Sequence, residues 1–387
     1  MQVNLYVAAL PVRSSPSTSE NTVLKHIKGL DTLRAFAVLF VLIQHWGPAF
    51  GAHHPTLQFL QCFFVPDGGA GVHMFFVLSG FLITGILLKA KEEAHGSSRI
   101  GVIKNFFIRR ALRIFPIYYI LIIILYFCYP DIKENITYFL TYTSNILSYR
   151  TNSWNSASHT WTLAVEEQFY LCWPWLILFI NNKYLKYVFA GAIAVGIIST
   201  YLIQGVRGPL LVFNSIDAFG IGAWYAYARL NEQRTLRSEK IIKIVTPVCL
   251  LLYFYWKAVL YAGTPLYAPF LIKTVDSILT IWLIMRIVNN RSQLVKKYVL
   301  ENRFLNFIGK ISYCLYLIHI YIPLFNPTIR TWVLNTMPHN PVTGIIADRF
   351  FLYFLDLVIV CTIALLSYYL IEQPILRLKK LFKYNSG

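Results

Sequence analysis

Ten apolar stretches dominate this sequence, and each is close to the 17 to 25 residues or so that a helix needs to cross a bilayer. They fall near residues 29–50, 71–89, 114–130, 160–180, 186–203, 211–229, 241–261, 266–287, 307–325 and 350–371. Charged residues make up only 13% of the chain, whereas soluble globular proteins typically contain about 25%. The sequence therefore predicts an all-α, polytopic membrane protein of about ten transmembrane helices.

The basic residues of the chain fall mostly on one side of these predicted helices. An even number of spans places both termini on one side, and if that side is cytoplasmic, 28 of the 35 Lys and Arg residues lie in inner segments. This asymmetry follows the positive-inside rule. We therefore expect cytoplasmic N- and C-termini. The net charge of +18 indicates membrane topology and phosphate-bearing partners at the inner face, and not nucleic acid.

The ends of the chain differ in composition from the apolar middle. Residues 1–28 are polar and rich in Ser and Thr, and the short apolar patch there lacks a basic n-region, so we expect a disordered cytoplasmic lead and no signal peptide. A transmembrane domain over 29–375 and a basic cytoplasmic tail over 376–387 complete the predicted organisation. The six dispersed cysteines form no CxxC pair and predict buried thiols, with no metal site and no disulfide framework.

The first apolar stretch carries Arg34 near its start and His45 eleven residues later. Eleven residues rise about 16 Å along a helix, so the two side chains lie on nearly the same face at different depths. An ionisable group deep in an apolar span costs at least ~2.5 kcal/mol unless it faces protein or water. We therefore expect His45 to be buried and to face a protein cavity.

Arginines gather where the inner loop meets the third apolar stretch. Arg110 and Arg113 are three residues apart and so are neighbours on one helix face. Such arginines often act as topology anchors or lipid head-group contacts. Their guanidinium groups also suit phosphate oxygens better than a lysine does, so a second interpretation is a site for a phosphorylated cytoplasmic ligand.

Carboxylates begin the fourth apolar stretch, at Glu166 and Glu167, and His159 lies two turns before the first of them. Two carboxylates in a span are costly, and the segment offers no basic partner, so function is favoured over a structural ion pair. Adjacent residues point about 100° apart, so one carboxylate is expected to face the bundle and the other solvent or another helix.

Other polar residues in the spans are predicted to be structural. Ser79 and Gly80 form a small-residue notch that favours close helix packing. Asp217 is expected to pair with Arg34 or another basic residue. Tyr316 and His319 share a helix face, and His319 is interpreted as a satisfied core histidine; no role is assigned to His73.

Six motifs occur in an order that resembles the acyltransferase-3 family of membrane O-acyltransferases. They are GLDTLRAFAVLFVLIQHW, GAGVHMFFVLSGFLIT, RRALRIFP, HTWTLAVEEQFYL, GKISYCLYLIH and IEQPILR, and the similarity runs from about Lys28 to Lys380. The resemblance implies a ten-helix core in a bacterial cytoplasmic membrane. It implies transfer of an acyl group, usually acetyl from acetyl-CoA, to a hydroxyl of a cell-surface carbohydrate such as O-antigen, exopolysaccharide or a glycolipid.

The resemblance also implies roles for particular residues. Arg34 and His45 match the family's essential arginine and histidine, Arg110 and Arg113 its arginine pair, and Glu166 its glutamate. Many members carry an arginine two residues before the aspartate of the sixth helix, where this chain has Ser215, so no family role is transferred to Asp217. With few residues after the last span, we expect the stand-alone membrane form without an SGNH-type domain.

The chemistry of acyl transfer fits these residue types. A sugar hydroxyl is a poor nucleophile, so it needs a base, and His45 has a suitable side chain. We expect Glu166 to orient or charge-stabilise that imidazole, as a carboxylate does in hydrolase triads. Arg110 and Arg113 are expected to hold the CoA phosphates, and Arg34 to extend that positive path inward. A covalent acyl-histidine intermediate stays open.

The group that stabilises the oxyanion is not defined by the sequence. Trp161, Tyr170 and the backbone amides near Ser79 are the candidates for substrate contacts. The expected donor is acetyl-CoA or another acyl-CoA, with no bound cofactor and no metal.

Two other classes of function remain open at this stage. Intramembrane His, Arg and Glu also build the proton relays of transporters, although no pair of broken helices appears in the two halves. A receptor-like or scaffold membrane protein is the third possibility. Release of CoA thiol from acetyl-CoA in the presence of an acceptor distinguishes the enzyme from both.

Overall fold

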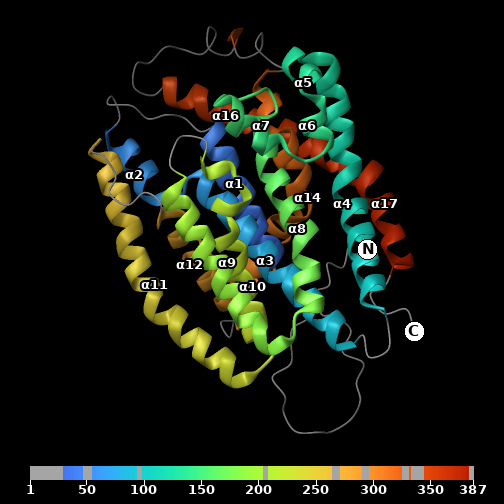
Figure 1. The fold of residues 1–387 in the computed structure, drawn as a ribbon. Helices are drawn as coiled ribbons and strands as arrows, with labels where there is room; N and C mark the ends of the chain where they lie inside the picture. Colours follow the sequence, from blue (N-terminus) through green and yellow to red (C-terminus); the bar gives the residue numbers. More distant parts are fainter. Residues whose placement is uncertain are drawn as a thin grey trace.

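The computed structural model is helical throughout the part of the chain that it describes (Figure 1). The described residues are 29–46, 55–93, 98–203, 208–263, 271–289, 296–324, 331–332 and 344–382. No β-strand occurs among them, so the all-α prediction is confirmed for this part of the chain. The predicted lead over 1–28 and the tail beyond residue 382 lie outside the described residues.

Each of the ten predicted apolar stretches coincides with a helix. The long helices are α1 (Leu30–Trp46), α3 (Gly68–Glu93), α4 (Arg99–Cys128), α8 (Trp161–Phe179), α9 (Asn182–Leu202), α10 (Ile216–Ala228), α11 (Glu232–Tyr261), α12 (Ile272–Val288), α14 (Arg303–Ile318) and α16 (Gly344–Ser367). The shorter helices are α2 (Pro55–Phe64), α5 (Pro130–Glu134), α6 (Ile136–Leu140), α7 (Ser144–Thr151) and α17 (Gln373–Arg377). Single turns lie between them at η1 (Ser158–Thr160), η2 (Gly208–Leu210), η3 (Val212–Asn214), η5 (Lys296–Leu300), η6 (His319–Leu324), η7 (Tyr368–Glu372) and η8 (Leu378–Leu381).

Six helical segments of the described chain are long and apolar enough to cross a membrane. They are Gln58–Glu93, Arg99–Cys128, Asn182–Leu202, Glu232–Tyr261, Arg303–Pro323 and Phe351–Leu381. This is the pattern of a multi-pass membrane protein. The other four predicted spans are occupied by α1, α8, α10 and α12, of which α10 has only 13 residues. The total of ten spans and the cytoplasmic location of the termini stay predictions.

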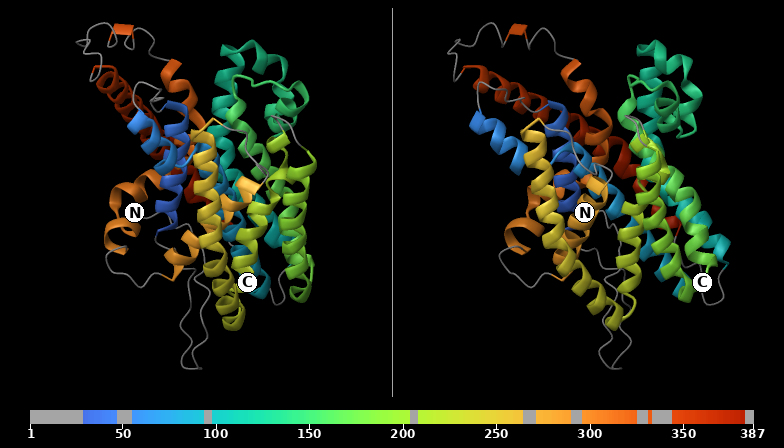
Figure 2. Two further views of the ribbon diagram at one scale, coloured as in Figure 1. Left: turned by 90° about the vertical axis from the view of Figure 1, so that its left-hand side faces the viewer. Right: turned by 60° about the vertical axis from the view of Figure 1, so that its left-hand side comes forward.

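Helix α3 lies near the middle of the bundle in Figure 1, and Figure 2 shows the same bundle from two further sides. It packs most extensively against α10 and α1, and also contacts α12 and α8, while α1 packs on α14. The short helices α5, α6 and α7 form a cap over one end of α4 and α8 (Figure 1). Three short helices thus occupy the segment between α4 and α8.

Glycines allow α3 and α10 to approach each other closely. A Cβ atom at Gly80 would lie 2.1 Å from the carbonyl oxygen of Phe219, and one at Gly222 would lie 2.1 Å from that of Val77. Both distances are far shorter than any van der Waals contact, so neither position accepts a side chain without moving a helix. The predicted packing notch is confirmed at Gly80.

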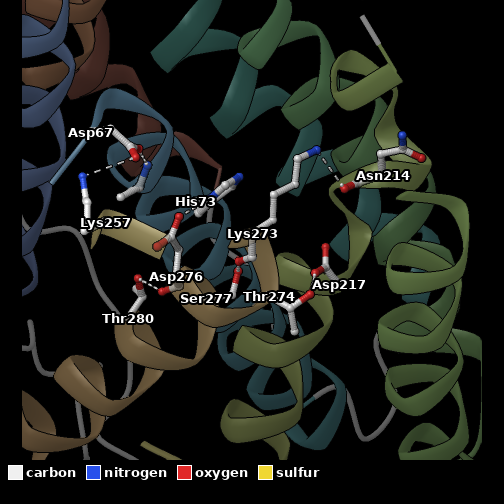
Figure 3. A network of polar contacts seen from close by, with 11 residues as sticks. Asp67, His73, Asn214, Asp217, Lys257, Lys273, Thr274, Asp276, Ser277 and Thr280 are labelled. Atoms are coloured by element: carbon white, nitrogen blue, oxygen red, sulfur yellow. Dashed lines mark hydrogen bonds and ion pairs between the residues drawn. The ribbon is translucent and has the colours of Figure 1, made fainter. Parts of the chain in front are cut away.

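A buried polar network joins α12 to α3 and α10 (Figure 3). Nδ1 of His73 on α3 lies 3.0 Å from Oδ2 of Asp276 on α12, and both residues are buried. A carboxylate oxygen can only accept, so this nitrogen of His73 carries the proton. The pair satisfies a carboxylate that would otherwise be isolated between helices.

Asp217 belongs to the same network and does not pair with Arg34. Its Oδ2 accepts a hydrogen bond of 2.7 Å from Thr274 Oγ1 on α12. The basic residue whose charge acts on Asp217 is Lys273, while Arg34 pairs with Asp31. The structural role predicted for Asp217 therefore involves α12, and not α1.

Substitution of Gly80 by Ala is expected to lower the stability of the bundle by roughly 1–3 kcal/mol, because the added methyl group overpacks the α3–α10 contact. Gly85 on the same helix has no atom within 4 Å of an added Cβ. Gly85→Ala is therefore the matched control, expected to be neutral or stabilising by up to about 1 kcal/mol. Both stability changes are measured by heating the detergent-purified variants and monitoring the loss of folded protein by size-exclusion chromatography. Equal behaviour of the two variants would contradict this packing.

Substitution of His73 by Ala is expected to cost about 3–5 kcal/mol, because it leaves the Asp276 carboxyl group buried without its partner. The double substitution His73→Leu, Asp276→Leu removes both polar groups and should recover most of that loss. The melting temperatures of the single and double variants provide the comparison. A double variant that is less stable than His73→Ala would show that the pair is not an isolated unit.

Candidate active site

A cavity lies inside the bundle, between α1, α3, α4, α8 and α14. The space not filled by atoms amounts to about 720 Å³, a figure that includes open solvent at the mouth. Apolar and aromatic side chains share its wall with charged and hydroxyl-bearing groups, which converge from all five helices and suit a small-molecule site. The charged lining residues are Arg34, Arg110, Arg113 and Glu166, and the hydroxyl-bearing ones are Ser79, Thr162, Tyr170, Ser312, Tyr313 and Tyr316.

Helical spacing explains why several polar residues face this cavity together. On α8, Thr162, Glu166 and Tyr170 follow one another at intervals of four residues and so form one stripe of the helix. On α4, Arg110 and Arg113 are three residues apart, as the sequence indicated. The next carboxylate, Glu167, is not among the lining residues. The expectation that only one of the two carboxylates faces the bundle cavity is thus met by Glu166.

A short chain of hydrogen bonds holds the Glu166 carboxylate. Tyr170 donates its hydroxyl proton to Ser79 Oγ at 3.1 Å, and Ser79 donates in turn to Glu166 Oε1 at 2.9 Å. Tyr170 and Ser79 come from different helices, so the chain fixes α8 against α3. Ser79 therefore lines the cavity, while its neighbour Gly80 forms the helix contact.

Among the described lining residues, three guanidinium groups face one carboxylate. Arg110 lies over the ring of Tyr170, 5.0 Å from its centroid, and 5.7 Å from that of Phe106. Within the described residues, neither Arg110 nor Arg113 forms an ion pair with a carboxylate. The cavity wall therefore carries more positive than negative charge, which favours an anionic ligand.

Arg34 is held more firmly than the other two arginines. Its Nη1 donates to Asp31 Oδ1 at 2.8 Å, one helical turn earlier on α1, and both side chains are largely buried. The ion pair fixes the direction of the guanidinium group, which also lines the cavity. Arg34 is thus a pre-oriented cation at the α1 side of the site.

His45 does not have the position that the sequence predicted. It lies in the last turn of α1, which ends at Trp46, and its side chain is exposed. It is not among the residues that line the cavity. The expectation of a buried His45 is therefore wrong. His45 also does not bond to Glu166, contrary to the expectation from sequence. The ring of His45 contacts Val41 and His319, while Glu166 Oε1 accepts a hydrogen bond from Ser79.

The ring of His45 is nevertheless well defined. Its Nδ1 lies 2.8 Å from the carbonyl oxygen of Val41 and 3.3 Å from Nε2 of His319. The carbonyl can only accept, so Nδ1 carries the proton and Nε2 keeps its lone pair. In the part of the chain that the structure describes, no group bonds to that Nε2.

Tyr316 connects the cavity with the histidines at the end of α1. Its hydroxyl accepts from Thr162 at 2.7 Å and donates to the carbonyl oxygen of His159 at 3.0 Å. Its ring lies 5.6 Å from that of His319, which in turn lies 4.8 Å from the ring of His45. The site thus has two parts, an arginine-lined cavity and a histidine cluster formed by His45, His159 and His319.

Of the remaining residues predicted to contact substrate, one lines the cavity and the other does not. Tyr170 lines the cavity, whereas Trp161 does not and instead packs edge-on against Phe76, with centroids 6.2 Å apart. The sequence predicts His319 as a core histidine and places Tyr316 only on the same helix face, and it does not identify Thr162 or Tyr313 as lining residues. The i, i+4 spacing of Thr162 and Glu166 was the available signal for the first of these.

Comparison with known proteins gives a consistent family assignment. The family model described as an acyltransferase domain, Acyl_transf_3, matches residues 27–372. The peptidoglycan O-acetyltransferase OatA of Listeria monocytogenes is 28% identical over 91% of this chain and 56% of its own length. A candidate O-acetyltransferase of Staphylococcus aureus is 29% identical over 91% of this chain and 57% of its own. A candidate peptidoglycan O-acetyltransferase of Bacillus subtilis is also 29% identical, over 91% of this chain and 55% of its own.

The chain spans little more than half the length of these relatives. No solved structure matches it significantly. The family match covers most of the sequence and includes every helix that lines the cavity. The chain therefore belongs to the acyltransferase-3 family.

Proposed function

We propose that this protein is a membrane O-acetyltransferase that moves an acetyl group from acetyl-CoA to a hydroxyl of a cell-envelope carbohydrate. The family membership and the names of its relatives support acyl transfer. The observation that carries the choice of donor is the excess of guanidinium groups in the cavity. The acceptor is assigned to the carbohydrate class that includes peptidoglycan, O-antigen and exopolysaccharide. The protein is assigned to a bacterial cytoplasmic membrane, which it crosses ten times with both termini in the cytoplasm.

The arginines suit the phosphate groups of CoA. Arg110 and Arg113 lie one turn apart on α4, and Arg34 reaches the same cavity from α1. Guanidinium groups bind phosphate oxygens through paired, charge-assisted hydrogen bonds, which a lysine cannot reproduce. Asp31 already pairs with Arg34, so among the described lining residues Arg110 and Arg113 are the cations whose charge a polyanionic nucleotide would balance.

The bare Nε2 of His45 suits the role of general base. As the acceptor hydroxyl attacks the thioester carbonyl, a C–O bond forms and the C–S bond breaks. The hydroxyl proton moves to His45 Nε2 and then to the departing CoA thiolate, so the imidazole returns to its neutral form. His45 and Arg34 are separated by about 16 Å along α1. The long pantetheine arm of CoA is the part of the donor that would bridge this distance.

Glu166 has a different role from the one expected in a triad. Through Ser79 and Tyr170 it joins α8 to α3. Its negative charge also offsets part of the charge of the arginines beside it. We assign it to the donor side of the reaction, where it shapes the cavity.

Substitution of His45 by Ala or by Asn should abolish acetyl transfer, because neither side chain accepts the hydroxyl proton. A loss of about 10²- to 10⁴-fold in kcat is expected. The assay measures CoA thiol released from acetyl-CoA by the detergent-purified protein, with peptidoglycan or polysaccharide fragments as acceptors. Gln44→Ala, an exposed neighbour on α1, is the control. Substrate uptake into vesicles without thiol release would favour a transporter.

Substitution of Arg113 or Arg110 by Ala should raise KM for acetyl-CoA about tenfold or more and change kcat less, because each removes a phosphate contact worth ~1.5–3 kcal/mol. Lys104→Ala is the matched control, since it removes one positive charge from an exposed position of the same helix. Steady-state kinetics at fixed ionic strength provides the measurement. An equal rise in KM in all three variants would indicate a general charge effect and no phosphate site.

A further inference from the structure

His319 is completely buried, and both of its ring nitrogens are engaged. Nδ1 lies 2.6 Å from the carbonyl oxygen of Tyr316, and Nε2 lies 3.3 Å from Nδ1 of His45. Because a carbonyl oxygen only accepts, Nδ1 of His319 carries the proton. Its Nε2 is therefore an acceptor, directed at His45.

The contact is complementary, because His45 carries its own proton on Nδ1. The N–H group of His45 thus faces the carbonyl oxygen of Val41 at 2.8 Å and the lone pair of His319 at 3.3 Å. Both neighbours are acceptors, so both favour the same tautomer. That tautomer is the one that leaves His45 Nε2 free.

We infer that His319 is a positioning residue for His45: it orients the imidazole, selects its Nδ1–H tautomer and stabilises the imidazolium that forms when Nε2 takes a proton. The inference rests on the proposed function only for its catalytic consequence. In this arrangement a neutral histidine takes the place that a carboxylate has in hydrolase triads. The hydrogen bond becomes charge-assisted once His45 is protonated.

Two further contacts tie this pair to the site. Trp46, the next residue of α1, donates from Nε1 to the carbonyl oxygen of His319 at 3.0 Å. The end of α1 is thereby fixed to His319 through both of its last two residues. Tyr316, which holds the His319 ring through its carbonyl, also lines the arginine cavity. A residue buried only for packing would not require this linked set of hydrogen bonds.

Kinetics of three variants test the catalytic part of the inference. His319→Leu removes the acceptor and fills the space, and it should lower kcat by about 10- to 100-fold with KM for acetyl-CoA unchanged. His319→Gln retains an oxygen acceptor near the position of Nε2 and should recover most of that loss. His73→Gln, which alters a buried histidine of the separate α3–α12 network, is the control and should retain wild-type kcat in the folded fraction.

The double variant provides the decisive comparison. In a His45→Ala background, His319→Leu should cause no further loss of activity, because a residue that acts through His45 has nothing left to position. Losses that multiply would overturn the inference, as would an equal loss in the Leu and Gln variants.

A measurement without turnover separates this inference from the proposed function. Long-range ¹H–¹⁵N spectra of histidine-labelled protein report the tautomer of His45. The wild type should show the Nδ1–H form, and His319→Leu should show a larger share of the Nε2–H form. An unchanged tautomer would overturn the inference even if the enzyme is active. The expected shift in a protein without acetyl transfer would retain it and overturn the proposed function instead.

Discussion

The charge imbalance inside an apolar bundle is the constraint on which the site depends. Arg34, Arg110 and Arg113 line one cavity with Glu166 as the carboxylate opposite them. Burying ions in a low-dielectric interior is costly unless partners compensate it. Asp31 pairs with Arg34, whereas neither Arg110 nor Arg113 has a carboxylate within ion-pair distance in the described part of the chain, and Glu372 acts on Arg113 only from farther away. An anionic ligand is the physical complement of such a wall.

The arginines and Glu166 could be recognised from sequence because a charged residue in or beside an apolar span needs a reason to be there. The helix contact at Gly80 followed from its small size. The exposure of His45 could not be predicted, because it depends on where α1 ends. The helix ends at Trp46, so His45 lies in its last turn. The roles of Tyr316 and His319 also required the structure, since each histidine or tyrosine taken singly fits a core residue.

Two of the polar networks that the structure describes serve different ends. The α3–α12 network, with His73 and Asp276 as its buried pair, satisfies polar groups between helices and faces no cavity that the structure describes. The network of Tyr316, His319 and His45 leads from the cavity to an exposed ring with a free lone pair. Of these two, the second has both a space for a substrate and an unused acceptor, which is why the proposed catalysis is assigned to it.

The most direct test of this account is an electron cryomicroscopy map of the protein with a non-hydrolysable acetyl-CoA analogue bound. The account predicts that the CoA phosphates contact Arg110 and Arg113 and that the carbonyl of the acetyl group lies near Nε2 of His45. An analogue bound outside the arginine-lined cavity, or one whose acetyl group cannot approach His45, would contradict it.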